Sequence, residues 1–222
     1  MSSGQNHIRV TGSLTGPLER PVLQWLSARA PAWLSPDMLT VIGVLGAAVT
    51  CVSYGLTHLH AGFLWMASLG IAINWFGDSL DGTLARFRHI ERPRYGFFVD
   101  HTADALSQVL ILLGLGMTPF VEFWISCLVL IGYLLLSVVV YIRTILEGVF
   151  QITFGRIGPT EARIVLVLVN GGIFFFGNEE IRLLSITTTM VDALLASVAA
   201  VLFTVFCISV LRHARRLGKM SE

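Results

Sequence analysis

Long apolar runs alternate with short polar segments from residue 38 to residue 211. A helix that crosses a bilayer needs about 20 mostly apolar residues. Six stretches meet this requirement to within a few residues, namely 38–57, 61–80, 97–117, 119–142, 162–177 and 188–211. The pattern therefore predicts an all-α integral membrane protein with six transmembrane helices, and it contains neither an internal repeat nor a second domain.

A different pattern precedes the first predicted span. Residues 18–34 mix leucines and tryptophans with arginines and prolines, which is typical of a short amphipathic helix at a membrane surface. An irregular linker is the alternative. We therefore expect one domain over residues 1–222, in which an N-terminal arm with an interfacial helix (1–35) precedes a six-helix transmembrane core (36–212).

The composition agrees with a membrane protein. Of the 222 residues, 55% are hydrophobic and 13% are charged, whereas soluble domains carry roughly 25% charged residues. The formal net charge of +1 indicates no highly charged partner, and we expect no nucleic acid. The three cysteines lie inside apolar runs without the spacing of a disulfide framework or a metal site.

The basic residues predict an orientation. With six spans, 14 of the 15 lysines and arginines fall on one side of the membrane, and only Arg182 falls on the other. Loops on the cytoplasmic side carry an excess of lysine and arginine. Both termini are therefore predicted to be cytoplasmic.

Four carboxylates lie at the cytoplasmic ends of two predicted spans. Asp78 and Asp81 are three residues apart in the second span, and Asp100 and Asp104 are four apart in the third. These spacings place each pair on one helix face. Ionisable groups within spans are costly and usually functional. Carboxylates this close repel one another unless a divalent cation binds, and oxygen ligands suit Mg²⁺, Mn²⁺ or Ca²⁺.

Neighbouring residues suggest a ligand for these ions. Gly82 leaves room for a ligand to approach the backbone. Arg86 lies one turn further on and has a planar guanidinium suited to phosphate oxygens. Gly96 lies one turn before Asp100 and allows close packing. Metal ions, an arginine and open backbone together indicate a diphosphate site.

The four aspartates allow two other interpretations. Solvated carboxylates paired with nearby arginines would give them a structural role. Carboxylates inside membranes also occur in transporters and proton relays. Transporters usually place charge near the midplane on broken helices, whereas these aspartates lie toward one surface. A transport role would also leave Gly82 and Arg86 without a function.

The same residues resemble a known signature. Residues 78–86 read DSLDGTLAR and, nine residues later, residues 96–104 read GFFVDHTAD. This resembles the signature of CDP-alcohol phosphotransferases, D-x-x-D-G-x-x-A-R followed by G-x-x-x-D-x-x-x-D, and every fixed position is present. The six-span layout with an amphipathic N-terminal helix is also similar to that family.

The resemblance implies a reaction. The four aspartates would bind two divalent ions, usually Mg²⁺ or Mn²⁺, which hold the CDP diphosphate together with Arg86. Gly82, Ala85 and Gly96 would let the nucleotide pack against the helices. An acceptor hydroxyl would attack after losing a proton to a base, which is the last aspartate, here Asp104, in many members. CMP would leave, and the partners would be a CDP-alcohol donor, an acceptor alcohol and membrane lipid.

Two further elements near the first two spans relate to the family less directly. Many members carry Pro-Asn-x-x-Thr before the first span, and residues 36–40 here read PDMLT, with Asp37 in place of asparagine. Asn74 lies one turn before Asp78, where it could contact the nucleotide or serve helix packing. Members are commonly dimeric, so a homodimer is an expectation.

Local features favour one branch of the family. Asp100-His101 matches the Asp-His of choline and ethanolamine phosphotransferases, and residues 158–161 (GPTE) resemble their Gly-Pro-x-Glu stretch. By this resemblance a neutral His101 oriented by Glu161 would be the general base, since imidazole titrates near neutral pH. The donor would be CDP-ethanolamine or CDP-choline, and the acceptor a lipid alcohol such as diacylglycerol.

The other branch stays open. The chain has the shorter layout common to CDP-diacylglycerol-dependent phosphatidyltransferases, which act on small polar alcohols such as glycerol phosphate, inositol phosphate or serine. Arg143, Arg156 and Arg163 would then form a pocket for a phosphorylated alcohol. Alternatively, they are ordinary basic residues of the cytoplasmic side.

Overall fold

The computed structural model describes residues 8–9, 14–147, 149–150, 158–183 and 186–220. Its helices are α1 (Gly16–Arg29), α2 (Pro36–Leu56), α3 (Phe63–Phe87), α4 (Pro93–Gly116), α5 (Phe123–Glu147), α6 (Pro159–Phe176) and α7 (Met190–Met220). The all-α class is confirmed. Two short strand pairs that the pattern did not predict join the helices: parallel β1 (Ile8–Arg9) with β2 (Val149–Phe150), and antiparallel β3 (Glu180–Leu183) with β4 (Ile186–Thr189).

Five helices of the described chain, α2, α4, α5, α6 and α7, are long and apolar enough to cross a membrane. The predicted span 61–80 corresponds to α3, which is not among these five helices. Its second half carries Asn74, Asp78, Asp81 and Arg86, and such residues lower the hydropathy by which spans are recognised. Five of the six predicted spans therefore have a helix that could cross a membrane, and a transmembrane position of α3 stays a prediction.

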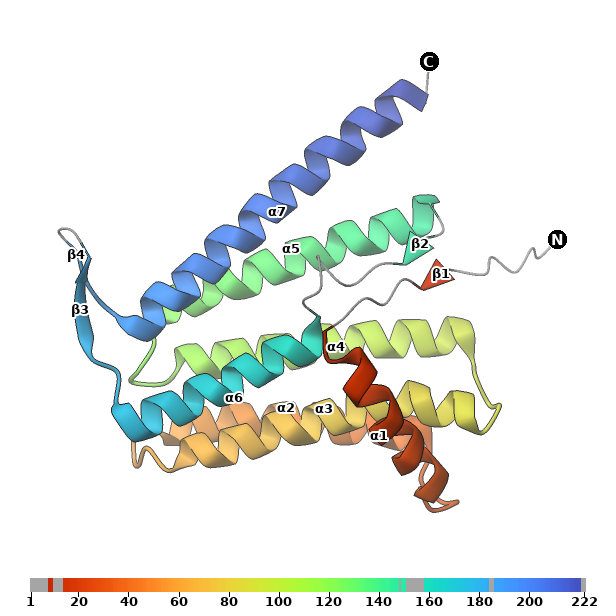
Figure 1. The fold of residues 1–222 in the computed structure, drawn as a ribbon, viewed down its shortest axis with the longest axis horizontal. Coiled ribbons are helices and arrows are strands. Elements are labelled where there is room, and N and C mark those ends of the chain that lie inside the picture. The colour runs from red at the N-terminus through yellow and green to blue at the C-terminus, as the bar shows by residue number, and fades with distance from the viewer. Residues whose placement is uncertain (1–7, 10–13, 148, 151–157, 184–185, 221–222) are drawn as a thin grey trace.

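The helices pack side by side in an extended bundle (Figure 1). α2 and α3 form one side, α4 and α6 lie in the middle, and α5 and α7 form the other side. α1 crosses the end of the bundle near the end of α3, and the β3–β4 pair lies at the opposite end. An apolar core between α2, α3, α4, α5 and α7 includes the buried side chains of Tyr54, Leu64, Ile111, Leu115 and Leu195.

Glycines let α2 and α3 approach closely. A Cβ atom placed on Gly46 would lie 2.7 Å from the carbonyl oxygen of Gly70, and one on Gly77 would overlap the backbone of Leu39 and Gly43. Helices in membranes associate through such small residues, because backbones can then come together without side chains between them. This crossing fixes the second half of α3 beside α2.

Contacts in the middle of α1 and just after its C-terminal end hold it against the bundle. Leu23 packs with four buried leucines, namely Leu34, Leu39, Leu80 and Leu84. The Arg88 guanidinium donates hydrogen bonds to the carbonyl oxygens of Ala30, Pro31 and Leu34 at 3.1, 2.8 and 2.6 Å. The helix predicted within residues 18–34 is thus present as α1. Trp25 and Trp33 are exposed, and their predicted place at a membrane surface stays a prediction.

Candidate active site

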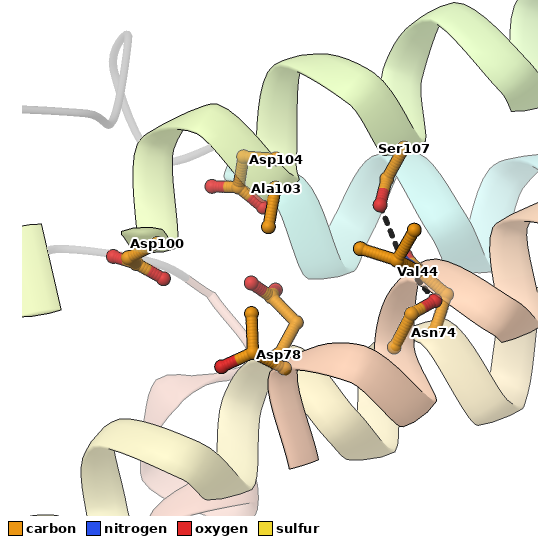
Figure 2. Close-up of a pocket in the computed structure, with 9 residues that line it drawn as sticks. Val44, Asn74, Asp78, Asp100, Ala103, Asp104 and Ser107 are labelled. Carbon is orange, nitrogen blue, oxygen red and sulfur yellow. Dashed lines mark hydrogen bonds between the residues drawn. The ribbon is translucent and has the colours of Figure 1, made fainter. Parts of the chain in front are cut away.

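Three carboxylates from two helices converge at one end of the bundle. Asp78 on α3 points toward Asp100 and Asp104 on α4 (Figure 2), and each offers an oxygen within 4.8 Å of the others. The spacing of four residues puts Asp100 and Asp104 on the same face of α4, as predicted. Because the turn between α3 and α4 is short, the two helices bring their carboxylates together.

The donor set of this group fits a hard divalent cation. Mg²⁺ and Ca²⁺ bind carboxylate oxygens at about 2.0–2.6 Å, so oxygens less than 4.8 Å apart can surround one ion. Three carboxylates that are each only partly exposed would otherwise repel one another in surroundings poor in water.

Asp81, the fourth predicted ligand, is not part of this group. It is buried, and its Oδ2 accepts a hydrogen bond from Thr40 Oγ1 on α2 at 2.6 Å. Its Oδ1 contacts the backbone N–H of Gly82. Thr40 is the last residue of the PDMLT stretch. This stretch, which matches the family pattern only in part, therefore contributes a hydrogen bond to an aspartate of the signature.

Asp37, which replaces the family's asparagine in the PDMLT stretch, forms an ion pair with Arg92. Asp37 accepts hydrogen bonds from Arg92 at 2.5 and 2.7 Å, and this bond raises the pKa of the Arg92 guanidinium. Arg92 precedes α4. The pair therefore links the start of α2 to the start of the helix that carries Asp100 and Asp104.

A small pocket opens beside the carboxylates. It is lined by residues of α2, α3 and α4, namely Thr40, Gly43, Val44, Asn74, Asp78, Asp100, Ala103, Asp104 and Ser107. Asn74 and Ser107 close the end away from the aspartates (Figure 2). The amide nitrogen of Asn74 donates to Gly43 O at 3.0 Å and to Ser107 Oγ at 3.1 Å. Its buried Oδ1 has no hydrogen-bond partner among the described residues.

The other residues of the signature lie on α3 and α4 outside this lining. Arg86 is exposed, donates to Thr83 Oγ1 at 3.2 Å, and lies 3.3 Å from the point where a Cβ of Gly82 would stand. Ala85 is partly exposed. Gly96 is exposed, with no atom of the described chain within 4 Å of a Cβ placed on it. Gly96 therefore leaves space for a ligand, whereas the Arg86 side chain lies against Gly82.

His101 and Glu161 do not pair in this structure. The ring of His101 is buried against Phe97 and Tyr141, at centroid distances of 4.1 and 5.2 Å, and its Nδ1 lies 3.5 Å from Asp100 Oδ2. Glu161 instead accepts hydrogen bonds from the N–H and hydroxyl of Thr15, both at 2.9 Å, and from the N–H of Gly158 at 2.8 Å. The carboxylate thus joins the start of α6 to the start of α1.

Arg163 on α6, which the sequence suggested only as part of a pocket for a phosphorylated alcohol, contacts the aspartates. Its side chain is 5% exposed, and its Nη1 donates to Asp78 Oδ2 at 2.7 Å, while Nη2 lies 3.9 Å from Asp104 Oδ1. The predicted pocket that Arg163 would form with Arg143 stays a prediction, and Arg156 lies outside the described residues. The contact of Arg163 with Asp78 was not predicted, although an arginine inside an apolar span is as costly as the aspartates there.

Known proteins resemble the chain in sequence and in fold. A family model described as CDP-alcohol phosphatidyltransferase matches residues 33–206. The cholinephosphotransferase 1 of Gallus gallus is 28% identical over 71% of this chain and 48% of that protein. The archaetidylinositol phosphate synthase of Pyrococcus horikoshii is 32% identical over 47% of this chain and 52% of that protein.

One solved structure has the same fold over most of the chain. A phosphatidylinositol phosphate synthase of Mycobacterium tuberculosis with CDP-DAG bound superimposes with a TM-score of 0.56 at 19% identity, over 90% of this chain and 93% of that one. In contrast, the chain spans only about half the length of the cholinephosphotransferase that it matches.

Proposed function

Because the chain belongs to the CDP-alcohol phosphatidyltransferase family, we propose that it transfers a phosphoalcohol group from a CDP-linked donor to an acceptor hydroxyl and releases CMP. The observation that carries this proposal is the convergence of Asp78, Asp100 and Asp104 beside a pocket between α2, α3 and α4. Phosphoryl transfer depends mainly on positioning and on neutralising charge, and this arrangement supplies both.

Asp78, Asp100 and Asp104 would hold one divalent ion, Mg²⁺ or Mn²⁺, and Asp81 would contribute to a second. Bound there, such ions neutralise the diphosphate and make its phosphorus more electrophilic. Thr40 supports this role of Asp81, because its hydrogen bond orients the buried carboxylate from the neighbouring helix.

The remaining polar residues would position the donor. Asn74 has an unpaired buried oxygen at the closed end of the pocket, which suits an N–H donor such as the amino group of cytosine. Arg86 lies beside Gly82, where its guanidinium would contact phosphate oxygens. Gly82, Ala85 and Gly96 would let the nucleotide pack against α3 and α4.

The acceptor hydroxyl must lose a proton as it attacks the phosphorus. We propose Asp104 as the base, supported by its position in the lining of the pocket. His101 is the second candidate, since its Nδ1 lies 3.5 Å from Asp100, but its ring packs between Phe97 and Tyr141 and it does not line the pocket. Glu161 would contribute by holding α1 in place.

For the substrates, we propose CDP-choline or CDP-ethanolamine as the donor and a lipid hydroxyl such as diacylglycerol as the acceptor. The resemblance to cholinephosphotransferases and the Asp100-His101 pair support this choice. The alternative is a CDP-diacylglycerol-dependent phosphatidyltransferase acting on a small polar alcohol. It is supported by the resemblance to an archaetidylinositol phosphate synthase.

The placement in the membrane is part of the proposal. α3 would also span the membrane and bring the number of spans to six, because it packs along α2 through the glycine crossing. The distribution of basic residues favours cytoplasmic termini and a cytoplasmic active site. The exposed Trp25 and Trp33 of the α1 region suit the headgroup layer, and a homodimer remains the expected assembly.

The test is CMP release by the full chain, purified and reconstituted in lipid with Mg²⁺ or Mn²⁺. CDP-choline and CDP-ethanolamine are offered with diacylglycerol, and CDP-diacylglycerol is offered with glycerol phosphate, inositol phosphate or serine. Release from the CDP-aminoalcohols supports the first choice, and release from CDP-diacylglycerol alone supports the alternative. If metal-loaded protein releases no CMP from any pair, the proposed function is wrong.

A variant in the same assay separates the two candidate bases. His101→Ala leaves the three aspartates intact, so turnover should persist if Asp104 is the base. A loss of turnover with unchanged binding of the CDP donor would instead assign the role to His101.

A further inference from the structure

Arg163 places a positive charge inside the carboxylate group. The residue is buried, and it reaches the group from α6, a helix that carries none of the proposed metal ligands. Its two terminal nitrogens face different aspartates, with Nη1 2.7 Å from Asp78 Oδ2 and Nη2 3.9 Å from Asp104 Oδ1. One guanidinium thus connects the aspartate of α3 with one of the two on α4.

The three carboxylates and Arg163 together carry an excess of negative charge that a divalent ion can neutralise. Asp78, Asp100 and Asp104 carry three negative charges when ionised, and Arg163 carries one positive charge. The remaining two negative charges equal the charge of one divalent cation. Without Arg163, three carboxylates within 4.8 Å of one another would repel strongly in a site that is only partly open to water.

The hydrogen bonds of Arg163 are incomplete. Its Nε and Nη2 are buried and have no hydrogen-bond partner among the described residues. Buried donors of a charged group are nearly always paired, because leaving them unpaired is costly. The incomplete pairing indicates that the guanidinium has another arrangement in which these donors are used.

We propose that Arg163 is an internal counter-cation of the carboxylate group, and that a divalent ion competes with it for Asp78. In the absence of metal, Arg163 keeps the three carboxylates together. When an ion binds, Asp78 serves the ion, and the guanidinium is released toward the pocket with its unused donors. This role rests on the proposed function in taking the three aspartates as metal ligands. It makes Arg163 a positioning residue that lowers the affinity of the empty site for metal.

Binding of Mn²⁺ to the full chain in lipid nanodiscs, without donor or acceptor, tests this role. Arg163→Gln is compared with the wild type by electron paramagnetic resonance of free Mn²⁺. A neighbouring charge changes the proton affinity of a carboxylate by about one to three pKa units, so Arg163→Gln should bind Mn²⁺ about tenfold more tightly. Arg94→Gln is the matched control. It removes an exposed arginine near the start of α4, the helix that carries Asp100 and Asp104. This variant should leave the Mn²⁺ affinity within about twofold of the wild type, because exposed charges are screened.

Thermal unfolding gives a second readout. In EDTA, Arg163→Gln should unfold at a lower temperature than the wild type, and saturating Mn²⁺ should close most of this gap. If Arg163→Gln cannot be purified, Arg163→Lys replaces it. Lysine keeps the charge but cannot bridge two carboxylates with a planar fork, so binding about two- to threefold tighter than wild type is expected.

The outcomes separate this role from the proposed function. If either Arg163 variant binds Mn²⁺ no more tightly than the wild type does, the counter-cation role is wrong. Asp100→Asn should abolish binding in the same assay. If the wild type binds no Mn²⁺, or binds it as well as Asp100→Asn does, the metal site itself is wrong, and the proposed function loses its support.

Discussion

Two buried polar regions of the bundle differ in how completely their polar atoms are paired. Between α2, α3 and α6, the hydroxyl of Tyr54 donates to Asn170 Oδ1 at 3.0 Å, and Asn170 Nδ2 donates to Ser68 Oγ at 3.0 Å. Ser68 in turn donates to Leu64 O at 2.8 Å. At the carboxylate group, by contrast, Asn74 Oδ1 and two nitrogens of Arg163 lack hydrogen-bond partners among the described residues.

This difference separates a structural role from a functional one. The atoms around Asn170 are neutral and have partners within the protein, so the region can hold three helices together without a ligand. The atoms around the aspartates are charged and partly unpaired, which would be costly unless something else binds there. Burial of polar groups alone therefore does not mark a site, whereas missing partners beside a group of carboxylates favour a ligand there.

The largest expected effect is on catalysis at the unpaired region. Asp100→Asn removes a ligand charge from the carboxylate group, and CMP release should fall by about a thousandfold, because metal ions contribute several kcal/mol to such reactions. The unfolding temperature in EDTA should stay the same or rise, since a repulsive charge is removed. Activity within tenfold of the wild type would contradict the metal site.

A pair of glycine substitutions distinguishes packing from ligand space. Gly77→Ala places a methyl group against the backbone of α2 and should cost about 3 kcal/mol of unfolding free energy, because the helices cannot separate without losing contacts. Gly96→Ala meets no described atom within 4 Å, so it should fold normally but raise the KM for the CDP donor. Unfolding in detergent and CMP release measure the two effects. Equal stability of both variants would contradict the glycine crossing.

A matched asparagine pair tests the comparison directly, since Asn74 and Asn170 are each 1% exposed. Asn170→Ala leaves Tyr54 without its partner and should lower stability by about 1 kcal/mol, with CMP release within twofold of the wild type. Asn74→Ala should lower CMP release by about tenfold, through the lost contact to the donor. If Asn170→Ala affects turnover more than Asn74→Ala does, the distinction drawn between the two regions fails.

The smallest effect is expected at Thr40. Thr40→Val keeps the shape of the side chain but removes the hydrogen bond to Asp81, so Asp81 should be less well oriented and the Mg²⁺ concentration for half-maximal CMP release should rise by about two- to fivefold. Thr204→Val is the control, because the hydroxyl of Thr204 donates to the carbonyl oxygen of Ala200 within α7 and Thr204 does not line the pocket. An unchanged Mg²⁺ requirement in Thr40→Val would argue against a metal-binding role of Asp81.

Local pattern accounts for much of this protein. Hydrophobic runs predicted the helices, because the length and polarity of a run decide whether it can form a spanning helix. The spacings within residues 78–86 and 96–104 predicted which aspartates share a helix face, because helical periodicity is a local property. The Asp100–Asp104 pair and its approach to Asp78 are therefore among the features that could be inferred without coordinates.

The partners of these residues were decided by packing between helices that are distant in the chain. Arg163 meets Asp78 across 85 positions, Thr40 meets Asp81 across 41, and Glu161 meets Thr15 across 146. No periodicity within a helix shows which face of α6 turns toward α3, or that Thr15 rather than His101 lies within reach of Glu161. The rotation and crossing of whole helices set these contacts, because close approach at Gly46 and Gly77 and the shape of the whole bundle determine which side chains meet.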